Sequence, residues 1–190
     1  MTLREELERY VPVNEQETLD KAIMLKYVDE PKAYMRENNE AHFTASSWVI
    51  NQNHDRVLTC YHNIYNSWSW LGGHADGNQD LRSVAIREVR EESGIEAVSA
   101  DDELLSVEIL TVDGHEKKGH YVSSHLHLNV TYLLIADDRQ PLKAKDDENR
   151  AVSWFDIDEV ISKSSEKWFR ERIYSKLNRK VLAKYGKLKG

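Results

Sequence analysis

The feature of this sequence that most restricts its fold is a glycine-rich segment that runs directly into a helix with defined ends. We expect the segment "GGHADGNQD" to form a glycine-rich loop after a strand, and it is followed by "LRSVAIREVREES". Asp80 can cap the start of the helix, and Gly94 can adopt the left-handed conformation that ends it. Leu81, Ala85 and Val89 recur every four residues, which places them on one apolar stripe. The sequence therefore predicts a helix between Asp80 and Gly94 that packs on a core through this stripe.

The same helix carries a concentration of acids. Glu88 and Glu92 lie four residues apart, and Glu91 lies beside them at the three-residue spacing. The three carboxylates are therefore expected to share one patch close to the glycine-rich segment. The simplest explanation of these acids is that they form a solvent-exposed face of the helix. Clustered like charges cost free energy, so either water screens them or a cation binds there, and oxygen ligands in this number suit Mg²⁺ or Mn²⁺.

The composition describes a chain that can form one well-buried core. Its 190 residues are 40% hydrophobic and 31% charged, and one domain with terminal additions is expected. The sequence has no apolar run of about 18 residues and no hydrophobic N-terminal segment, so we expect a cytoplasmic protein without a membrane partner. Cys60 is the single cysteine. It cannot form an internal disulfide, and we expect it to be a small core residue of a strand.

Charge is distributed unevenly along the chain. Residues 163–190 contain 10 Lys and Arg against 2 acids, which leaves 16 basic and 31 acidic residues before them. The acidic body disfavours nucleic acid as a partner, because phosphates require positive charge. The apolar positions of the basic tail recur at helical spacing: Trp168 or Phe169, Ile173, Leu177 and Val181. We expect an amphipathic helix that packs on the body rather than a contact with RNA or a membrane.

The chain divides into three regions. Residues 1–40 are predicted to form a helical extension, with a break at Pro31. Residues 41–162 are predicted to form the main domain, where "HFTASSWVI" and "RVLTCYHN" are typical of strands and "NQNHD" of a turn between them. Residues 163–190 are the basic amphipathic helix. We expect strands and helices to combine in one α/β domain.

A later strand alternates between polar and apolar residues. In "YVSSHLHLNVTYLLIA", His125 and His127 face one side with Asn129 and Thr131, while the leucines, Val130 and the tyrosine between them face the core. An exposed sheet face and a substrate-contacting face explain this pattern equally well. We disfavour a zinc site, because the sequence offers no apparent third ligand.

The segment from Gly73 to Ile95 resembles the sequence box of the Nudix hydrolases. That pattern is Gly, five residues, Glu, seven residues, Arg-Glu, an aliphatic residue, any residue, Glu-Glu, any residue, Gly and an aliphatic residue. The matching positions are Gly73, Arg87, Glu88, Val89, Glu91, Glu92, Gly94 and Ile95. So many fixed positions over a long spacing make the match specific. Gln79 stands where the family has Glu, which predicts weaker support of Arg87 or weaker metal affinity rather than loss of chemistry.

The resemblance implies an α/β/α sandwich with a mixed β-sheet and a metal site at the box. The implied metal ligands are Glu88, Glu91, Glu92 and the backbone carbonyl of Gly72. Mg²⁺ is the expected cofactor, with Mn²⁺ as an alternative. Arg87 is expected to brace the ligand helix through hydrogen bonds rather than to contact the substrate.

The general base is left open. Asp147 and Glu148 lie in the region where some members of the family place a further metal ligand or the base. Of these two we favour Glu148. Glu88 or Glu91 could take the role instead.

The resemblance implies a small-molecule substrate, a nucleoside diphosphate derivative, whose diphosphate linkage is cleaved by a water activated for attack on phosphorus. The rival hypothesis is a non-catalytic nucleotide-binding module on the same fold, because Gln79 departs from the family pattern. An isopentenyl diphosphate isomerase of this fold is disfavoured, because Cys60 does not lie in the glycine-rich segment. The sequence leaves a homodimer open.

Overall fold

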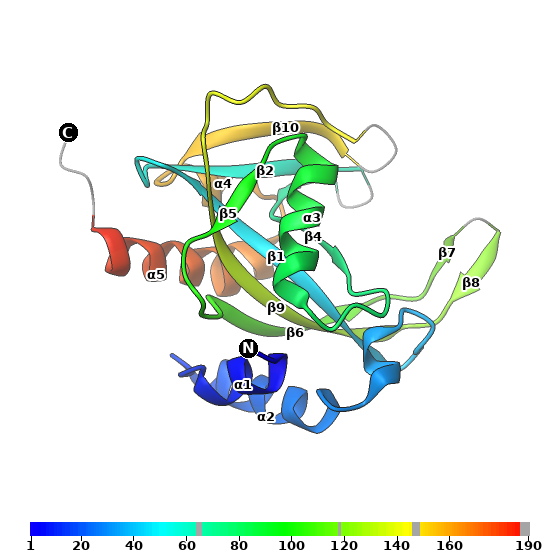
Figure 1. Cartoon of the computed structure of the whole chain (residues 1–190). Helices are drawn as coiled ribbons and strands as arrows, with labels where there is room; N and C mark the ends of the chain where they lie inside the picture. The colour runs from blue at the N-terminus through cyan, green and yellow to red at the C-terminus, as the bar shows by residue number, and fades with distance from the viewer. Residues whose placement is uncertain (64–65, 118, 146–148, 187–190) are drawn as a thin grey trace.

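The computed structural model describes residues 1–63, 66–117, 119–145 and 149–186, which form a mixed β-sheet flanked by helices (Figure 1). In this part of the chain the sheet has the strand order β10-β2-β1-β9-β5, with β3 paired to β2, β4 to β1 and β6 to β9, and β7 and β8 form a separate hairpin. The strands are β1 (Ala41–Asn51), β2 (Arg56–His62), β3 (Ser67–Ser69), β4 (Leu71–His74), β5 (Ala97–Ser99), β6 (Ser106–Val112), β7 (His115–Lys117), β8 (His120–Val122), β9 (His125–Ala136) and β10 (Asn149–Asp156). The expected α/β sandwich with a mixed sheet is confirmed.

The centre of the sheet is the parallel pair of β1 and β9. Every residue of β1 is buried, and the strand pairs with Leu126–Ala136 of β9 along its whole length. In this register His42 lies opposite His127, while on the other side of β9 the antiparallel strand β6 places Leu110 opposite His127. A parallel pair requires a long crossover connection. Residues that are far apart in the sequence therefore meet at the same level of the sheet.

The helix α3 (Leu81–Ser93) lies across one face of the sheet, and its ends are those that the sequence predicts (Figure 1). The Asp80 side chain accepts a hydrogen bond from the Ser83 backbone N–H at 3.1 Å, and Gly94 ends the helix with a φ of 75°. The predicted apolar stripe is buried in the core: Leu81, Ala85 and Val89. Full burial of a Leu or Val side chain contributes about 1.5–3 kcal/mol. This stripe therefore holds α3 firmly on the sheet.

The C-terminal helices pack against the opposite face of the sheet. They are α4 (Val160–Lys163), the π-helix η2 (Phe169–Tyr174) and α5 (Ser175–Tyr185). Ile173, Leu177 and Val181 are buried as the helical spacing predicts, together with Trp48 of β1. Trp168, by contrast, is 57% exposed. The packing stripe therefore continues through Phe169, the other candidate for that position.

The N-terminal helices cover one edge of the sheet, beside β6 (Figure 1). They are α1 (Leu3–Arg9), α2 (Glu15–Tyr27) and the 3₁₀ helix η1 (Pro31–Tyr34). The predicted break at Pro31 is confirmed, because Pro31 begins a separate short helix. In the part of the chain that the structure describes, no helix has both the length and the apolar character needed to cross a membrane.

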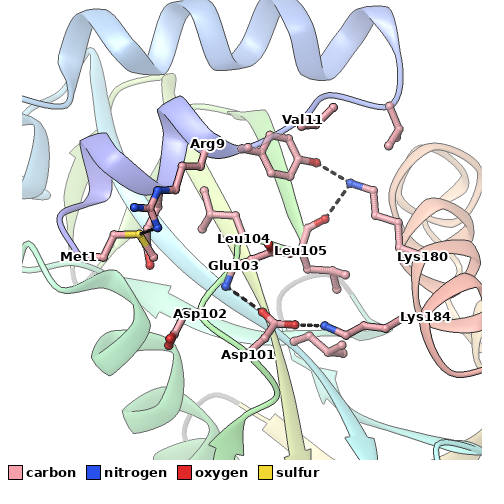
Figure 2. Close-up of a pocket in the computed structure, with 14 residues that line it drawn as sticks. Met1, Arg9, Val11, Asp101, Asp102, Glu103, Leu104, Leu105, Lys180 and Lys184 are labelled. Atoms are coloured by element: carbon pink, nitrogen blue, oxygen red, sulfur yellow. Dashed lines mark hydrogen bonds and ion pairs between the residues drawn. The ribbon is translucent and has the colours of Figure 1, made fainter.

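Lysines of α5 reach across to the N-terminal helices. A cavity of about 440 Å³ is bordered by α1, the loop between β5 and β6, and α5, and Figure 2 shows the residues that line it. Lys180 Nζ donates to the Tyr10 hydroxyl and, at 2.7 Å, to the Leu105 carbonyl, and Lys184 forms an ion pair with Asp101. The residues that line this cavity include neither the acids of the predicted box nor the histidines of β9. Lys180 and Lys184 of the basic tail therefore form contacts within the protein.

Candidate active site

The two glycines that the sequence placed in a loop lie instead in β4, and Gly72 pairs with Ser46 of β1. A Cβ added to Gly72 would lie 2.5 Å from the Ala45 carbonyl oxygen, and one added to Gly73 would lie 2.5 Å from the Glu88 carboxyl carbon. Glycine in a strand commonly marks such a close approach. The expectation of a loop was wrong because pairing with β1 continues through these residues. The absent side chains allow carboxylates of α3 to reach the backbone of β4.

Glu92 joins three elements of the fold. Its carboxylate accepts a hydrogen bond from the Gly72 N–H at 2.9 Å and one from Asn149 Nδ2 at 3.2 Å. The residue is 4% exposed. Buried carboxylates require such donors, because burial without a hydrogen bond is costly. Glu92 therefore fastens α3 to β4 and β10, whatever further ligand it binds.

Glu88 and Glu91 flank the side chain of Arg87. Arg87 Nη2 donates to Glu88 Oε1 at 2.8 Å and to the His74 carbonyl at 3.4 Å, and Arg87 Nε lies 3.6 Å from Glu91 Oε1. Lys145 Nζ lies 4.0 Å from the other oxygen of Glu91. The Glu88 side chain is 12% exposed and that of Glu91 is 46% exposed. Arg87 thus links the two carboxylates to the end of β4.

Burial raises the pKa of Glu88 above its ordinary value. The hydrogen bond and charge of Arg87 oppose this change, whereas the negative charge of Glu91 adds to it. A raised carboxyl pKa means that the local positive charge does not fully compensate the carboxylate. A bound cation would supply the missing charge.

The donor atoms around β4 fit a hard divalent cation. Glu88, Glu91 and Glu92 supply carboxylate oxygens beside the β4 backbone, and the Glu91 side chain is 46% exposed. Carboxylate and carbonyl oxygens are the ligands that Mg²⁺ and Mn²⁺ prefer. These residues would hold the ion, which would polarise phosphoryl oxygens and activate water when bound.

Gln79 is exposed in the connection between β4 and α3. Asp147 and the predicted base Glu148 lie outside the described residues.

The polar face of β9 is the face that the alternating pattern predicts, but much of it is buried. Asn129 Oδ1 accepts hydrogen bonds from Thr44 Oγ1 at 3.0 Å and from Ser46 Oγ at 2.9 Å. Thr131 Oγ1 donates to Glu108 Oε2 at 3.2 Å. The alternative of an exposed sheet face is therefore wrong for Asn129 and Thr131, which are 1% and 0% exposed.

Three histidines gather at the end of this face: His42, His125 and His127. Their ligand nitrogens lie within 4.8 Å of one another, and among the described residues no other set of three His, Cys, Asp or Glu gathers so closely. His125 Nε2 lies 3.2 Å from His127 Nε2. The reason for disfavouring a zinc site was wrong, since β1 supplies a third imidazole. Sequence reasoning missed His42 because only the parallel pairing of β1 with β9 brings it to His127.

The histidine group lies next to the glycine strand, and burial disfavours the charged form of two of its members. Burial lowers the pKa of His127 to about 2, and the neighbouring imidazoles act in the same direction. Burial also lowers the pKa of His42, against the effect of the Asn38 carbonyl. The ring centroid of His74 lies 5.2 Å from that of His42 and 5.0 Å from that of His127. Since Arg87 donates to the His74 carbonyl, β4 connects the histidines to the acids of α3.

Comparisons with known proteins identify the family and the fold. The NUDIX domain family model matches residues 40–177. A hydrolase of the NUDIX family from Clostridium perfringens is 20% identical, with a TM-score of 0.52 over 74% of this chain and 95% of that one. The E. coli dihydroneopterin triphosphate pyrophosphohydrolase is 14% identical, with a TM-score of 0.53 over the same shares. At these identities the two structures support the fold alone. No protein of curated function matches the sequence.

Proposed function

This chain belongs to the Nudix hydrolases, and we propose that it cleaves a diphosphate linkage in a nucleoside diphosphate derivative with the help of a divalent metal, Mg²⁺ or Mn²⁺. The observation that carries the proposal is the meeting of the α3 carboxylates with the glycine strand β4. Glu88 packs against Gly73, and Glu92 accepts the N–H of Gly72. Such a contact between a helix of acids and strand backbone makes an oxygen-rich pocket for a hard cation.

The net charge explains why such a reaction needs a metal. The protein has a formal net charge of −7, and a diphosphate is itself negatively charged, so the two repel one another. Glu88, Glu91 and Glu92, with the Gly72 carbonyl, are the proposed metal ligands. In this assignment the acids of α3 bind the cation, and the cation in turn makes this acidic surface attractive to the substrate.

The other side chains of the site receive positioning or proton-transfer roles. We assign Arg87 to positioning, because it bonds to Glu88 and to the His74 carbonyl. The proposed general base is Glu148, with Glu88 and Glu91 as the alternatives. His125 and His127 are the proposed substrate contacts on the polar face of the sheet.

We also propose a role for each of the three regions of the chain. Residues 41–162 would form the catalytic domain, residues 1–40 a helical extension, and residues 163–190 a basic helix that packs on the domain. We propose a cytoplasmic location, no nucleic-acid or membrane partner, and leave a homodimer as the open alternative to a monomer.

A substrate panel tests the proposal most directly. Purified protein would be incubated with ADP-ribose, nucleotide sugars, dinucleoside polyphosphates, coenzyme A and nucleoside triphosphates, each with Mg²⁺, with Mn²⁺ and with EDTA. Metal-dependent release of a phosphate-bearing product from at least one compound is expected. The Glu91→Gln variant serves as the matched control for contaminating hydrolases.

A different result would favour the rival function. If a compound binds tightly with Mg²⁺ yet stays intact over hours, the chain is a nucleotide-binding module. In that case restoring the family residue with Gln79→Glu tests whether the departure at this position is responsible.

A further inference from the structure

The histidine group at the end of β1 and β9 has the composition of a second, chemically different metal site. We propose that His42, His125 and His127 bind one divalent transition metal of the zinc class, separately from the carboxylates of α3. Imidazole nitrogen suits Zn²⁺, Co²⁺, Ni²⁺ and Cu²⁺, whereas Mg²⁺ prefers oxygen. The proposal goes beyond the diphosphate reaction and does not depend on it.

The spacing of the nitrogens fits a tetrahedral ion. With zinc–nitrogen bonds of about 2.0–2.1 Å, two ligand nitrogens of a tetrahedral site lie about 3.3 Å apart. His125 Nε2 and His127 Nε2 are 3.2 Å apart. The ligand nitrogens of all three residues lie within 4.8 Å of one another, so a small side-chain adjustment completes the third bond.

Hydrogen bonds to the far nitrogens orient two of the rings. His42 Nδ1 lies 2.9 Å from the Asn38 carbonyl oxygen, and His125 Nδ1 lies 2.7 Å from the Ser123 carbonyl oxygen. A carbonyl accepts only from an N–H, so each Nδ1 carries the proton and each Nε2 presents a lone pair. Metal-binding histidines typically have this second interaction, which fixes the tautomer and the ring direction.

One ring nitrogen of this group is left without a hydrogen-bond partner among the described residues. That nitrogen is His42 Nε2, which is buried. Because His42 and His125 carry their protons on Nδ1, only His127 can have a proton on Nε2. That proton would point to His125 Nε2, which lies beside it. The same proton cannot also bond to His42 Nε2. A metal ion at the common point would accept all three lone pairs, which removes the cost of a buried, unpaired acceptor.

Three histidines leave one coordination position open. Zinc sites with three protein ligands hold water or another small ligand in the fourth position. His125 and His127 are only partly buried, so this position can be reached from outside. If the proposed hydrolase function holds, an oxygen of the anionic substrate would bind there, and the metal would be the means by which the two histidines contact it.

Cobalt provides the direct test. Metal-free full-length protein, in the Glu91→Gln background to weaken the carboxylate site, would be titrated with Co²⁺ in the presence of excess Mg²⁺. We expect the intense visible absorption of tetrahedral cobalt with nitrogen ligands, at one ion per chain. Calorimetry with Zn²⁺ should give the same stoichiometry. Only weak octahedral absorption, or no saturable binding, would overturn the proposal.

Histidine variants locate the ion. His125→Gln and His42→Gln should each weaken Co²⁺ and Zn²⁺ binding by at least about 100-fold, because even an outer-shell change typically costs 10–100-fold. His54→Asn is the matched control, since His54 lies in the turn at the other end of β1 and stacks on Tyr185. Circular dichroism and melting curves would verify folding, and His125→Gln removes the less buried ring. Unchanged affinity in both His125→Gln and His42→Gln would contradict the assignment.

Discussion

Two groups of glutamates in this protein differ in how completely neighbouring Lys and Arg side chains balance their negative charge. The first lies on α3 beside β4 and contains Glu88, Glu91 and Glu92. Arg87 contacts Glu88 and Glu91, and Lys145 Nζ lies 4.0 Å from Glu91 Oε2. One of its members, Glu91, reaches solvent. Within the described residues, the cationic side chains shown to lie against these three carboxylates are two, Arg87 and Lys145.

The second group lies where α2 and β6 meet α5. Glu17 and Glu108 are fully buried, and Lys176 Nζ lies 2.8 Å from Glu17 Oε1 and 2.9 Å from Glu108 Oε1. Lys180 Nζ lies 3.0 Å from the same Glu17 oxygen. Here two carboxylates meet two ammonium groups, and none of the four reaches bulk water freely.

The difference separates structural acids from acids available to a ligand. Buried ion pairs that are fully matched hold elements together, and breaking one is costly. Acids with excess charge and some access to solvent can instead bind a cation from outside. The comparison predicts that changes at β4 affect catalysis, whereas changes at the buried pair affect stability.

The largest expected effect is on turnover. Glu88→Gln and Glu91→Gln each remove one proposed metal-binding charge but keep the shape of the side chain, so the hydrolysis rate should fall about 10²- to 10⁴-fold. The melting temperature should change little, because neither carboxylate is matched by a buried partner. Glu96→Gln, at an exposed ion pair with Arg90, is the control. Full activity in both variants would remove the distinction between the two groups.

The next effect is on the free energy of unfolding. Lys176→Met leaves Glu17 and Glu108 in the interior without their shared cation, and such a loss typically costs about 3–5 kcal/mol. Urea unfolding should reveal it, while activity at low temperature is retained. Lys184→Met is the control, because that lysine pairs with Asp101 at the surface and should cost less than about 1 kcal/mol. Equal losses in both variants would show that the buried pair has no special role.

At acidic pH the Glu17–Lys176 ion pair should contribute less to the free energy of unfolding. Burial raises the pKa of Glu17, but the hydrogen bond and charge of Lys176 outweigh this and lower the pKa from 4.5 to about 2. The stabilisation is complete above pH 4.5, and it is lost as the pH falls toward 2, because the unfolded chain then binds a proton that folded Glu17 does not. The change is about 3 kcal/mol. Unfolding curves of the protein and of Glu17→Gln should converge over this range, and parallel curves would refute the prediction.

The smallest expected effect is at the exposed position of the box. Gln79→Glu should leave turnover unchanged at saturating Mg²⁺ and raise it by no more than about 10-fold at low Mg²⁺, since supporting residues of a metal site commonly act through affinity. The measurement is the dependence of rate on metal concentration in both proteins. A loss of activity would indicate that Gln79 suits this particular site better than the family residue does.

Local sequence signals determined the helix at the centre of the site. The ends of α3 depend on the Asp80 cap and on the positive φ of Gly94, and its buried stripe depends on a spacing within one helix. These interactions span a few residues, so the sequence contains all that is needed to predict them. The two faces of β9 followed in the same way from alternation. The box residues likewise indicated the family, which the match over residues 40–177 supports.

Only the tertiary structure decided which of these residues meet. The glycines of the box became part of β4 because β1 pairs with them, and His42 joined His127 because β1 and β9 are parallel neighbours. The uneven charge of the chain was visible in its sequence, but the partners of Lys176 depend on how α5 crosses the sheet. Strand order and register are fixed by burial and hydrogen bonding between distant segments. Those terms have no local signature, so the sequence by itself predicted the elements and chemistry, and the packing decided their combination.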